Sequence, residues 1–188
     1  PHDEVDALMG LLEQYLAGER AKMMRYGIRL VAVGDRSRLP ESVKTVLEET
    51  IVLTRENQRM TVILALSYSG RDEIVRMAKR LAQEARDRRL DPDEIDERMV
   101  AAHLDGGEVP DPDLLIRTSG EMRISNFYLW QIAYSELYVT PTLWPDFRET
   151  EYLQALLAYQ RRRRRFGRTD EQLSEPMELP ARADGRQS

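Results

Sequence analysis

Residues 113–138 read DLLIRTSGEMRISNFYLWQIAYSELY, and this stretch decides the fold that the sequence predicts. It opens with a short apolar run, Asp113–Ile116, which is typical of a buried strand, and polar residues follow that run at once. In open α/β sheets, ligands bind at the carboxyl ends of the strands. We therefore expect a binding site directly after Ile116.

The polar residues after this strand form a set that is suited to an anion. They are Arg117, Thr118, Ser119, Gly120, Glu121, Arg123, Ser125 and Asn126. Guanidinium groups bind phosphate oxygens bidentately, and hydroxyls and backbone N–H groups satisfy the remaining lone pairs. The set predicts a diphosphate site. For an arbitrary Arg-x5-Arg spacing taken by itself, a surface loop with two solvated arginines is the better interpretation.

Outward from this stretch, strands and helices alternate along the chain with short connections. Strands are expected at 28–33, 60–66, 113–116 and 136–140, and helices at 3–26, 40–56, 72–88, 91–103, 126–134 and 148–166. This alternation predicts the α/β class, as a single domain with a mainly parallel central sheet flanked by helices. The tail, 168–188, lacks aromatic residues and periodicity, so we expect it to be disordered.

Composition limits the classes of function. The sequence has 188 residues, a formal net charge of −5 and no cysteine, which excludes disulfides and thiolate metal sites. Because no apolar run is long enough to span a membrane and no secretory signal is evident, we expect a cytoplasmic protein. The acidic balance argues against general nucleic-acid binding. Neither His2 nor His103 has a partner at metal-ligand spacing.

The string R-T-S-G-E-x-R-I-S-N-F-x-L-W-Q-x-A-Y-x-E-L-Y at 117–138, followed by W-P-D-F at 144–147, closely resembles one signature. It is similar to that of the cis-prenyltransferases, typified by bacterial undecaprenyl diphosphate synthase. The resemblance extends less densely from Pro1 to about Gly167, so we expect a cis-prenyltransferase domain over 1–167. It implies a hydrophobic tunnel between the sheet and the helices, which receives the growing prenyl chain.

The resemblance also implies a reaction. An allylic diphosphate, typically farnesyl diphosphate, is elongated by isopentenyl diphosphate to a long-chain polyprenyl diphosphate such as undecaprenyl diphosphate, a lipid carrier of cell-wall precursors. It implies magnesium as the cofactor and a homodimer. Because the product is very hydrophobic, peripheral contact with the inner face of the membrane is expected. The absence of an Asp-Asp-x-x-Asp pattern separates the sequence from trans-prenyltransferases.

Roles can be carried over from the family by position. Arg117, Arg123 and Ser125 would hold the diphosphate of isopentenyl diphosphate, and Glu136 would be a magnesium ligand. From the residues alone, Glu136 could instead be a salt-bridged acid near the sheet.

The C-terminal arginine run also matches a family element. Arg165 and Gly167 match the Arg-x-Gly element, which in the family reaches across the dimer interface to the diphosphate in the neighbouring active site. From the residues alone, the run 161–165 could be a solvated helix end that complements the helix dipole.

Three apolar residues are assigned to the tunnel by the same resemblance. Leu8 and Leu12 lie on the apolar stripe of the first expected helix. Met60 matches a position near the far end of the tunnel, where side-chain bulk limits product length. From periodicity alone, the helix stripe is better explained as ordinary core. Arg71, after the second expected strand, lies near the active-site rim by resemblance, or is a surface residue at a helix start.

The family pattern also has a region upstream of this sequence. That region carries an Asp-Gly-Asn loop and an Asn-Trp-x-Arg-Pro element, and Pro1 resembles the proline that closes the latter. The magnesium-binding aspartate is absent from this sequence, so no catalytic residue is assigned here. A non-catalytic partner subunit is therefore the main alternative to an enzyme, although the retained site residues favour the enzyme. An unrelated phosphate-binding module is the third possibility.

Overall fold

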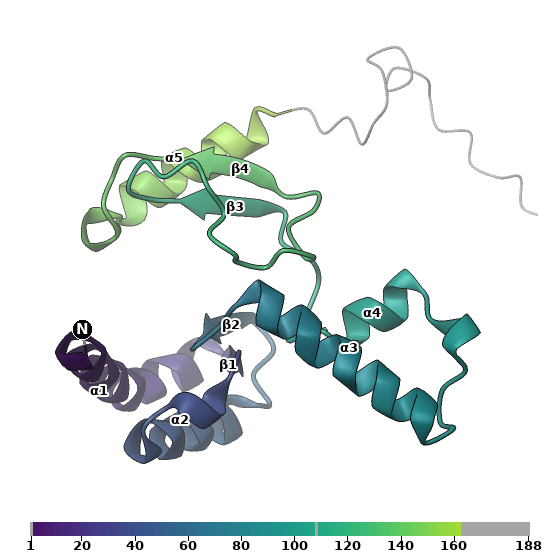
Figure 1. Cartoon of the computed structure of the whole chain (residues 1–188). Coiled ribbons are helices and arrows are strands. Elements are labelled where there is room, and N and C mark those ends of the chain that lie inside the picture. The colour runs from purple at the N-terminus through teal and green to yellow at the C-terminus, as the bar shows by residue number, and fades with distance from the viewer. Residues whose placement is uncertain (1, 108, 163–188) are drawn as a thin grey trace, which may run out of the picture. The chain divides into compact units, whose positions relative to one another are not determined.

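The computed structural model describes residues 2–107 and 109–162, which divide into two compact units (Figure 1). Unit 1 contains the described residues up to Leu115 together with Met122–Ser135. Unit 2 contains Ile116–Glu121 and the described residues from Glu136 onward. The expected disorder of 168–188 concerns residues outside this range.

The elements of unit 1 alternate between helix and strand, as the sequence predicts. They are α1 (His2–Tyr26), β1 (Ile28–Val33), α2 (Glu41–Thr54), β2 (Met60–Ala65), α3 (Gly70–Arg86) and α4 (Glu97–His103). β1 and β2 are parallel, with Ile28 opposite Met60 and Val33 opposite Ala65. Helix α2 is the connection between these parallel strands, which confirms the α/β class.

The core of unit 1 lies where α1 and α2 pack against β1 (Figure 1). Its buried members are Leu16, Met23, Leu30, Leu39 and Leu47. Complete burial of a leucine side chain stabilises a fold by roughly 1.5–3 kcal/mol. The apolar stripe of α1 therefore supplies core residues in its second half.

Two buried threonines add polar links between these elements. The Thr54 hydroxyl accepts the backbone N–H of Leu30 at 3.0 Å. The Thr50 hydroxyl accepts Nε of Arg20 at 2.9 Å, and Arg20 also pairs with Glu49 at 2.8 Å. Because each threonine hydroxyl has a partner, neither is an unsatisfied polar group in the core.

A second cluster joins α3 to α4 through Met77, Leu81 and Leu104. The expected single helix over 91–103 is wrong, because that region contains a 3-10 turn (Pro92–Glu94) before α4. Ile95 is extended and separates the two elements. Asp96 then starts α4, since its side chain accepts a backbone N–H three residues later at 2.8 Å.

β3 (Leu114–Arg117) and β4 (Glu136–Val139) form a second, two-stranded sheet. Unit 2 contains β4 and the last two residues of β3, because the division between the units falls after Leu115. A 3-10 turn (Trp144–Asp146) leads to α5 (Glu149–Gln160), which packs against β4 and buries Ala155 completely. The helix expected over 148–166 thus ends at Gln160, and residues 163–166 lie outside the described range. Among the described residues, no helix is both long and apolar enough to cross a membrane.

Candidate diphosphate-binding site

The residues predicted to bind diphosphate are divided between the two units. Arg117 is the last residue of β3 and Glu136 the first residue of β4, and both belong to unit 2. Arg123 and Ser125 lie in Met122–Ser135, which belongs to unit 1.

In unit 2, the loop after β3 is held by backbone hydrogen bonds. The N–H of Ser119 donates to the carbonyl of Thr142 at 2.9 Å, and the N–H of Gly120 donates to Thr140 at 2.8 Å. The N–H of Thr140 donates to the carbonyl of Arg117 at 2.9 Å. Ser119 and Gly120 both have positive φ, 65° and 67°, which glycine adopts without a steric penalty. The turn that follows Arg117 is thus fixed to the segment after β4.

Glu136 forms an ion pair at the start of β4. Its Oε2 accepts from Nη1 of Arg162 at 2.7 Å, and the two side chains are 31% and 36% exposed. A salt-bridged acid was one interpretation of the sequence, and this contact agrees with it. In the predicted role as a magnesium ligand, this carboxylate would be shared between Arg162 and the metal, or the metal would replace the arginine.

The carboxylates among the described residues show whether magnesium fits the site. No group of three or more His, Cys, Asp or Glu side chains among them could hold a metal ion. Magnesium is usually bound by one or two carboxylates together with substrate phosphates and water. Glu136 therefore fits magnesium only in company with diphosphate oxygens.

In unit 1, the segment that carries Arg123 and Ser125 forms turns, so the helix expected over 126–134 is wrong. Ser125, Asn126 and Tyr128 have φ of 48°, 63° and 44°. An α-helix requires φ near −63°, so these residues prevent a helix from starting here. The apolar residues of this segment therefore have a helix-like spacing in the sequence but lie on successive turns of the chain.

Asn126 attaches this segment to the N-terminus of α3. Its carbonyl accepts the N–H of Gly70 at 2.8 Å, and its Oδ1 accepts the N–H of Arg71 at 3.0 Å. Its Nδ2 donates to the hydroxyl of Ser69 at 2.8 Å. The first N–H groups of a helix have no partner within the helix, so Asn126 satisfies two of them. A Cβ at Gly70 would lie 2.9 Å from Leu129, so this close approach requires glycine.

A buried carboxylate on α3 provides a second attachment. Glu73 is 1% exposed and accepts from the Tyr68 hydroxyl, the Asp105 backbone N–H at 2.7 Å and Nε2 of Gln131 at 2.9 Å. Burial raises the pKa of Tyr68, and its hydrogen bond to Glu73 raises that pKa further. A buried polar group is tolerated when it is hydrogen-bonded, as Glu73 is here.

Glu73 was not among the residues predicted for the site, although the sequence contains a signal for it. Glu73, Met77 and Leu81 follow each other at four-residue steps, so the glutamate occupies the buried face of α3. An acid at such a position is an indication of a buried hydrogen-bonded site. The hydrogen bonds that join Asn126 to the start of α3 had no comparable signal, because the partners of Asn126 are more than 50 residues away in the sequence.

Removal of the Tyr68 hydroxyl is expected to destabilise unit 1. The Tyr68→Phe variant keeps the edge-to-face contacts with Phe127 and Tyr128 but withdraws one donor from Glu73. We expect a loss of about 1.5 kcal/mol in the free energy of unfolding, measured by urea denaturation. The control is Tyr134→Phe, at a side chain that is 89% exposed, and it should change the midpoint little. Equal midpoints for the two variants would contradict the role given to Tyr68.

The residues predicted for the tunnel have different environments. Leu8 and Met60 are 60% and 57% exposed, whereas Leu12 packs against the core. A cavity of about 200 Å³ lies between α1 and the β1–β2 sheet. Its apolar lining consists of Leu16, Met23, Ile28, Leu30, Val62 and Leu64. The assignment of Leu8, Leu12 and Met60 to a tunnel stays a prediction.

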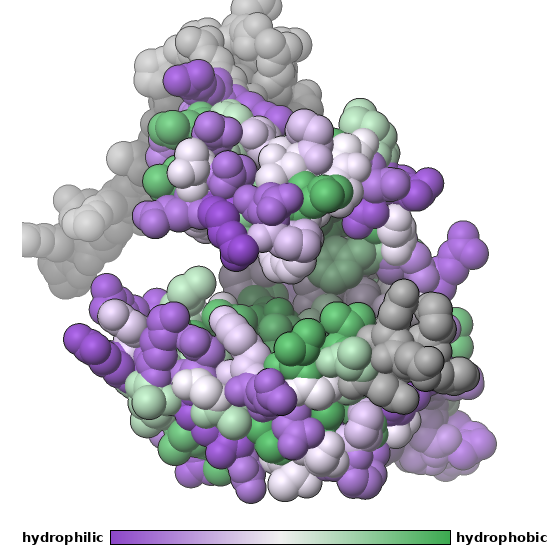
Figure 2. Space-filling model, turned by 90° about the vertical axis from the view of Figure 1, so that its left-hand side faces the viewer, coloured by the Kyte–Doolittle hydropathy of each residue, from purple (hydrophilic) through white to green (hydrophobic). Residues whose placement is uncertain are grey.

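Apolar side chains also reach the surface of unit 1. Figure 2 shows hydrophobic residues gathered among hydrophilic ones on the unit that carries α1 and α2. On α1, the exposed apolar side chains include Val5, Leu8 and Leu11.

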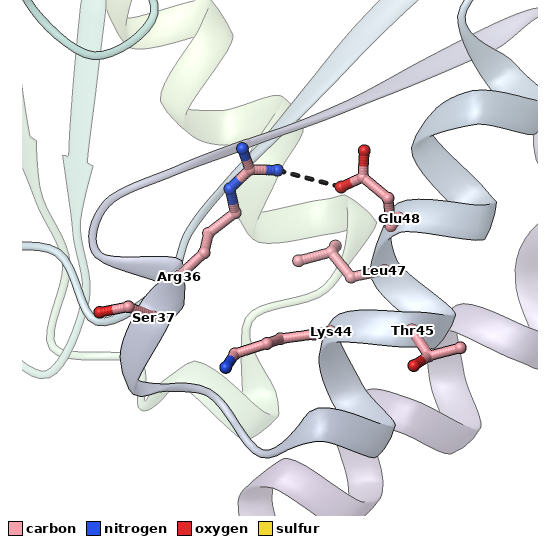
Figure 3. A pocket seen from close by; sticks show the side chains of 6 residues that line it. All are labelled: Arg36, Ser37, Lys44, Thr45, Leu47 and Glu48. Atoms are coloured by element: carbon pink, nitrogen blue, oxygen red, sulfur yellow. Dashed lines mark hydrogen bonds and ion pairs between the residues drawn. The ribbon is translucent and has the colours of Figure 1, made fainter.

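A further pocket, of about 500 Å³, lies between the turn after β1 and α2 (Figure 3). Arg36 and Lys44 line it, but Arg36 pairs with Glu48 at 3.2 Å and Lys44 pairs with Glu41 at 2.6 Å. None of the residues predicted for diphosphate contributes to its lining. This pocket is therefore distinct from the candidate site.

Comparison with known proteins gives a consistent result. The chain is 49% identical over 173 residues to an isoprenyl transferase of Chlorobaculum tepidum, covering 92% of this chain and 65% of that protein. It superimposes on lavandulyl diphosphate synthase of Lavandula x intermedia, solved in complex with dimethylallyl diphosphate, with a TM-score of 0.86 and 40% identity. That match covers 89% of this chain and 72% of the other. For a probable undecaprenyl diphosphate synthase of Campylobacter jejuni the TM-score is 0.78, with 34% identity and coverages of 89% and 76%.

The fold and the similarity of the chain to these proteins thus place it among the prenyltransferases. The match to one family runs over residues 1–167, and the chain belongs to the undecaprenyl diphosphate synthase family. The chain spans about two thirds of the length of the curated relatives that it matches.

Proposed function

We propose that this protein elongates an allylic diphosphate with isopentenyl diphosphate to give a long-chain polyprenyl diphosphate with cis double bonds. Farnesyl diphosphate is the expected allylic substrate and undecaprenyl diphosphate the expected type of product. The observation that carries the proposal is that a member of this family contains, in this stretch, the three residues predicted for diphosphate, Arg117, Arg123 and Ser125, and the predicted magnesium ligand, Glu136. A subunit that only supports a partner would have little need of these residues.

The reaction defines what the site residues must do. A carbon–carbon bond forms between the two prenyl units, the allylic carbon–oxygen bond breaks, and isopentenyl diphosphate loses a proton. Inorganic diphosphate departs with the electron pair of the broken bond. Arg117, Arg123 and Ser125 hold the diphosphate of isopentenyl diphosphate, because two guanidinium groups and a hydroxyl can satisfy its oxygens. Holding the second substrate in place lowers the entropy cost of the condensation.

Magnesium is part of the proposal, with Glu136 and substrate diphosphate oxygens as its ligands. When bound, the ion would neutralise negative charge that accumulates on the departing diphosphate. We also propose a homodimer in which Arg165 and Gly167, both outside the described residues, contact the diphosphate of the neighbouring subunit. Peripheral contact with the membrane would allow release of the hydrophobic product.

Arg162 is expected to compete with magnesium for Glu136. In the Arg162→Ala variant the carboxylate loses its 2.7 Å ion pair, so half-maximal activity should require about two- to fivefold less magnesium. The measurement is the initial rate against magnesium concentration. The Arg161→Ala variant removes an equal charge at the neighbouring position and should leave the metal requirement unchanged. Identical shifts in the two variants would show a general charge effect instead of competition at Glu136.

Binding of isopentenyl diphosphate tests the proposed function directly. We expect saturable binding by calorimetry, and competition from inorganic diphosphate but not from isopentenol, because the site recognises the diphosphate group. A non-catalytic partner subunit should not bind isopentenyl diphosphate. Failure of the protein to bind it would therefore reject the enzyme in favour of that alternative.

A further inference from the structure

We infer that Asn126 is a positioning residue, which orients Arg123 and Ser125 for diphosphate by holding their segment on the N-terminus of α3. The inference rests on the proposed function of Arg123 and Ser125, and it adds a residue to which neither the family motif nor the comparisons give a role. The sequence placed Asn126 among the polar residues suited to an anion, but its side chain is used for contacts within the protein, so it is not proposed as a diphosphate ligand. Its side-chain oxygen contacts Arg71 at 3.0 Å, and its side-chain nitrogen contacts Ser69, the N-cap of α3, at 2.8 Å.

The backbone conformation of the segment shows why it needs contacts to hold it. We call the hydrogen bonds of Asn126 with Ser69, Gly70 and Arg71 the clamp. Ser125 and Asn126 are consecutive residues with positive φ, at 48° and 63°. Such conformations are unfavourable for residues other than glycine and persist only where surrounding contacts impose them. Ser125 is thus presented by a strained turn, and Arg123 lies two residues before it.

The contacts that impose this turn come from a distant part of the chain. Three hydrogen bonds join Asn126 to Ser69, Gly70 and Arg71, which are the cap and the first residues of α3. One of them uses the backbone carbonyl of Asn126, and two use its side-chain amide. Removal of the amide therefore leaves a single hydrogen bond between Asn126 and the start of α3, that of its backbone carbonyl with Gly70.

Further contacts hold the later part of the segment to α3 and to Tyr68, which lies just before that helix. Gln131 donates to the buried carboxylate of Glu73 at 2.9 Å, and the rings of Phe127 and Tyr128 pack against Tyr68. These contacts keep the later turns in place when the Asn126 amide is removed. The loss should therefore be local to the turn that presents Ser125 and Arg123.

The Asn126→Gly variant tests the inference, because glycine accepts the positive φ and only the amide is lost. We expect the KM for isopentenyl diphosphate to rise about tenfold, as the loss of two hydrogen bonds suggests. The KM for the allylic diphosphate and kcat should change less than about twofold, because these two bonds serve one substrate. A general loss of folded protein would lower the rate without this division between the two substrates.

A matched control removes a helix cap elsewhere in unit 1. Asp96→Gly deletes the side chain that accepts an N–H of α4 at 2.8 Å, and Asp96 has no hydrogen bond to Met122–Ser135 among the described contacts. This variant should lose stability and keep both KM values. An equal rise in the KM for isopentenyl diphosphate in Asp96→Gly would overturn the inference.

Ser69→Ala provides a second variant, on the opposite side of the clamp. It removes the hydroxyl that accepts Nδ2 of Asn126, so it should raise the same KM by a smaller factor. Combined with Asn126→Gly, it should add little, because both changes break one set of bonds. If the increase in KM of the double variant equalled the product of the two single increases, the residues would act independently, and the inference would be overturned.

Failure of the proposed function is distinguishable from failure of this inference. If the unmodified protein does not bind isopentenyl diphosphate, the proposed function is wrong, and hydrogen exchange of the amides in 122–131 then decides about the clamp. Faster exchange in Asn126→Gly than in the unmodified protein would support the clamp. Equal exchange rates, or an unchanged KM for isopentenyl diphosphate in the folded variant, would overturn it.

Discussion

Replacing Arg123 by alanine is expected to raise the KM for isopentenyl diphosphate and to lower turnover strongly. A charge-assisted bidentate contact contributes roughly 1.5–3 kcal/mol, which corresponds to about ten- to a hundredfold. The residue is exposed in unit 1, two positions before Ser125, so its loss should leave the core intact. The measurement is steady-state kinetics with each substrate varied in turn, after circular dichroism has shown that the variant is folded.

Two further variants identify the cause of this effect. Arg123→Lys keeps the positive charge but loses the planar fork of donors, so its KM should lie between those of the unmodified protein and Arg123→Ala. Arg89→Ala removes an exposed arginine beyond the end of α3, where it pairs with Asp87, and should have no effect. Unchanged kinetics in a folded Arg123→Ala variant would refute the role given to Arg123.

Replacing Glu136 by glutamine is expected to abolish most of the magnesium-dependent rate. The change keeps the size of the side chain and removes its charge, so it acts on the metal more than on packing. Loss of one electrostatic group at a reacting centre lowers kcat by about a hundredfold or more. The measurement is the rate over a range of magnesium concentrations.

The control for Glu136 is another acid of unit 2. Glu149→Gln removes a carboxylate in the first turn of α5 and should leave the metal dependence unchanged. Full activity of Glu136→Gln with an unchanged metal optimum would contradict the predicted ligand. It would also leave the ion pair with Arg162 as the better account of this glutamate.

Local patterns in the sequence predicted most of the regular elements. The stripes of α1 and α2 and the apolar strands β1 and β2 were predicted because a single segment contains all the information that each requires. The positions of Arg117 and Glu136 next to strand ends follow in the same way. Family membership follows from the long string at 117–138, and the comparisons confirm it.

The segment after Arg123 shows where such patterns fail. Its spacing of apolar residues is close to that of a helix, but its backbone is set by Ser69–Arg71, which no local window contains. Tertiary contacts of this kind override propensity. The prediction of a single helix over 91–103 was wrong for a different reason. Asp91 caps the 3-10 turn and Asp96 caps α4, so the region contains two separate elements.

The roles within the candidate site depend on ligands and could not be settled by folding patterns. For Glu136, the sequence left a metal ligand and a salt-bridged acid as alternatives. The ion pair with Arg162 agrees with the second alternative. The roles of Arg117, Arg123 and Ser125 stay predictions for the kinetic experiments. Because these residues are divided between two units, variants of each unit can be studied separately.

The central claim is that the protein joins isopentenyl units to an allylic diphosphate. Its most direct test is incubation with farnesyl diphosphate, radiolabelled isopentenyl diphosphate and magnesium, followed by mass analysis of the extracted lipid. We predict labelled polyprenyl diphosphates that are longer than the starting diphosphate by whole isoprene units, with one inorganic diphosphate released for each unit added. Binding of isopentenyl diphosphate without any lengthened product would contradict the claim.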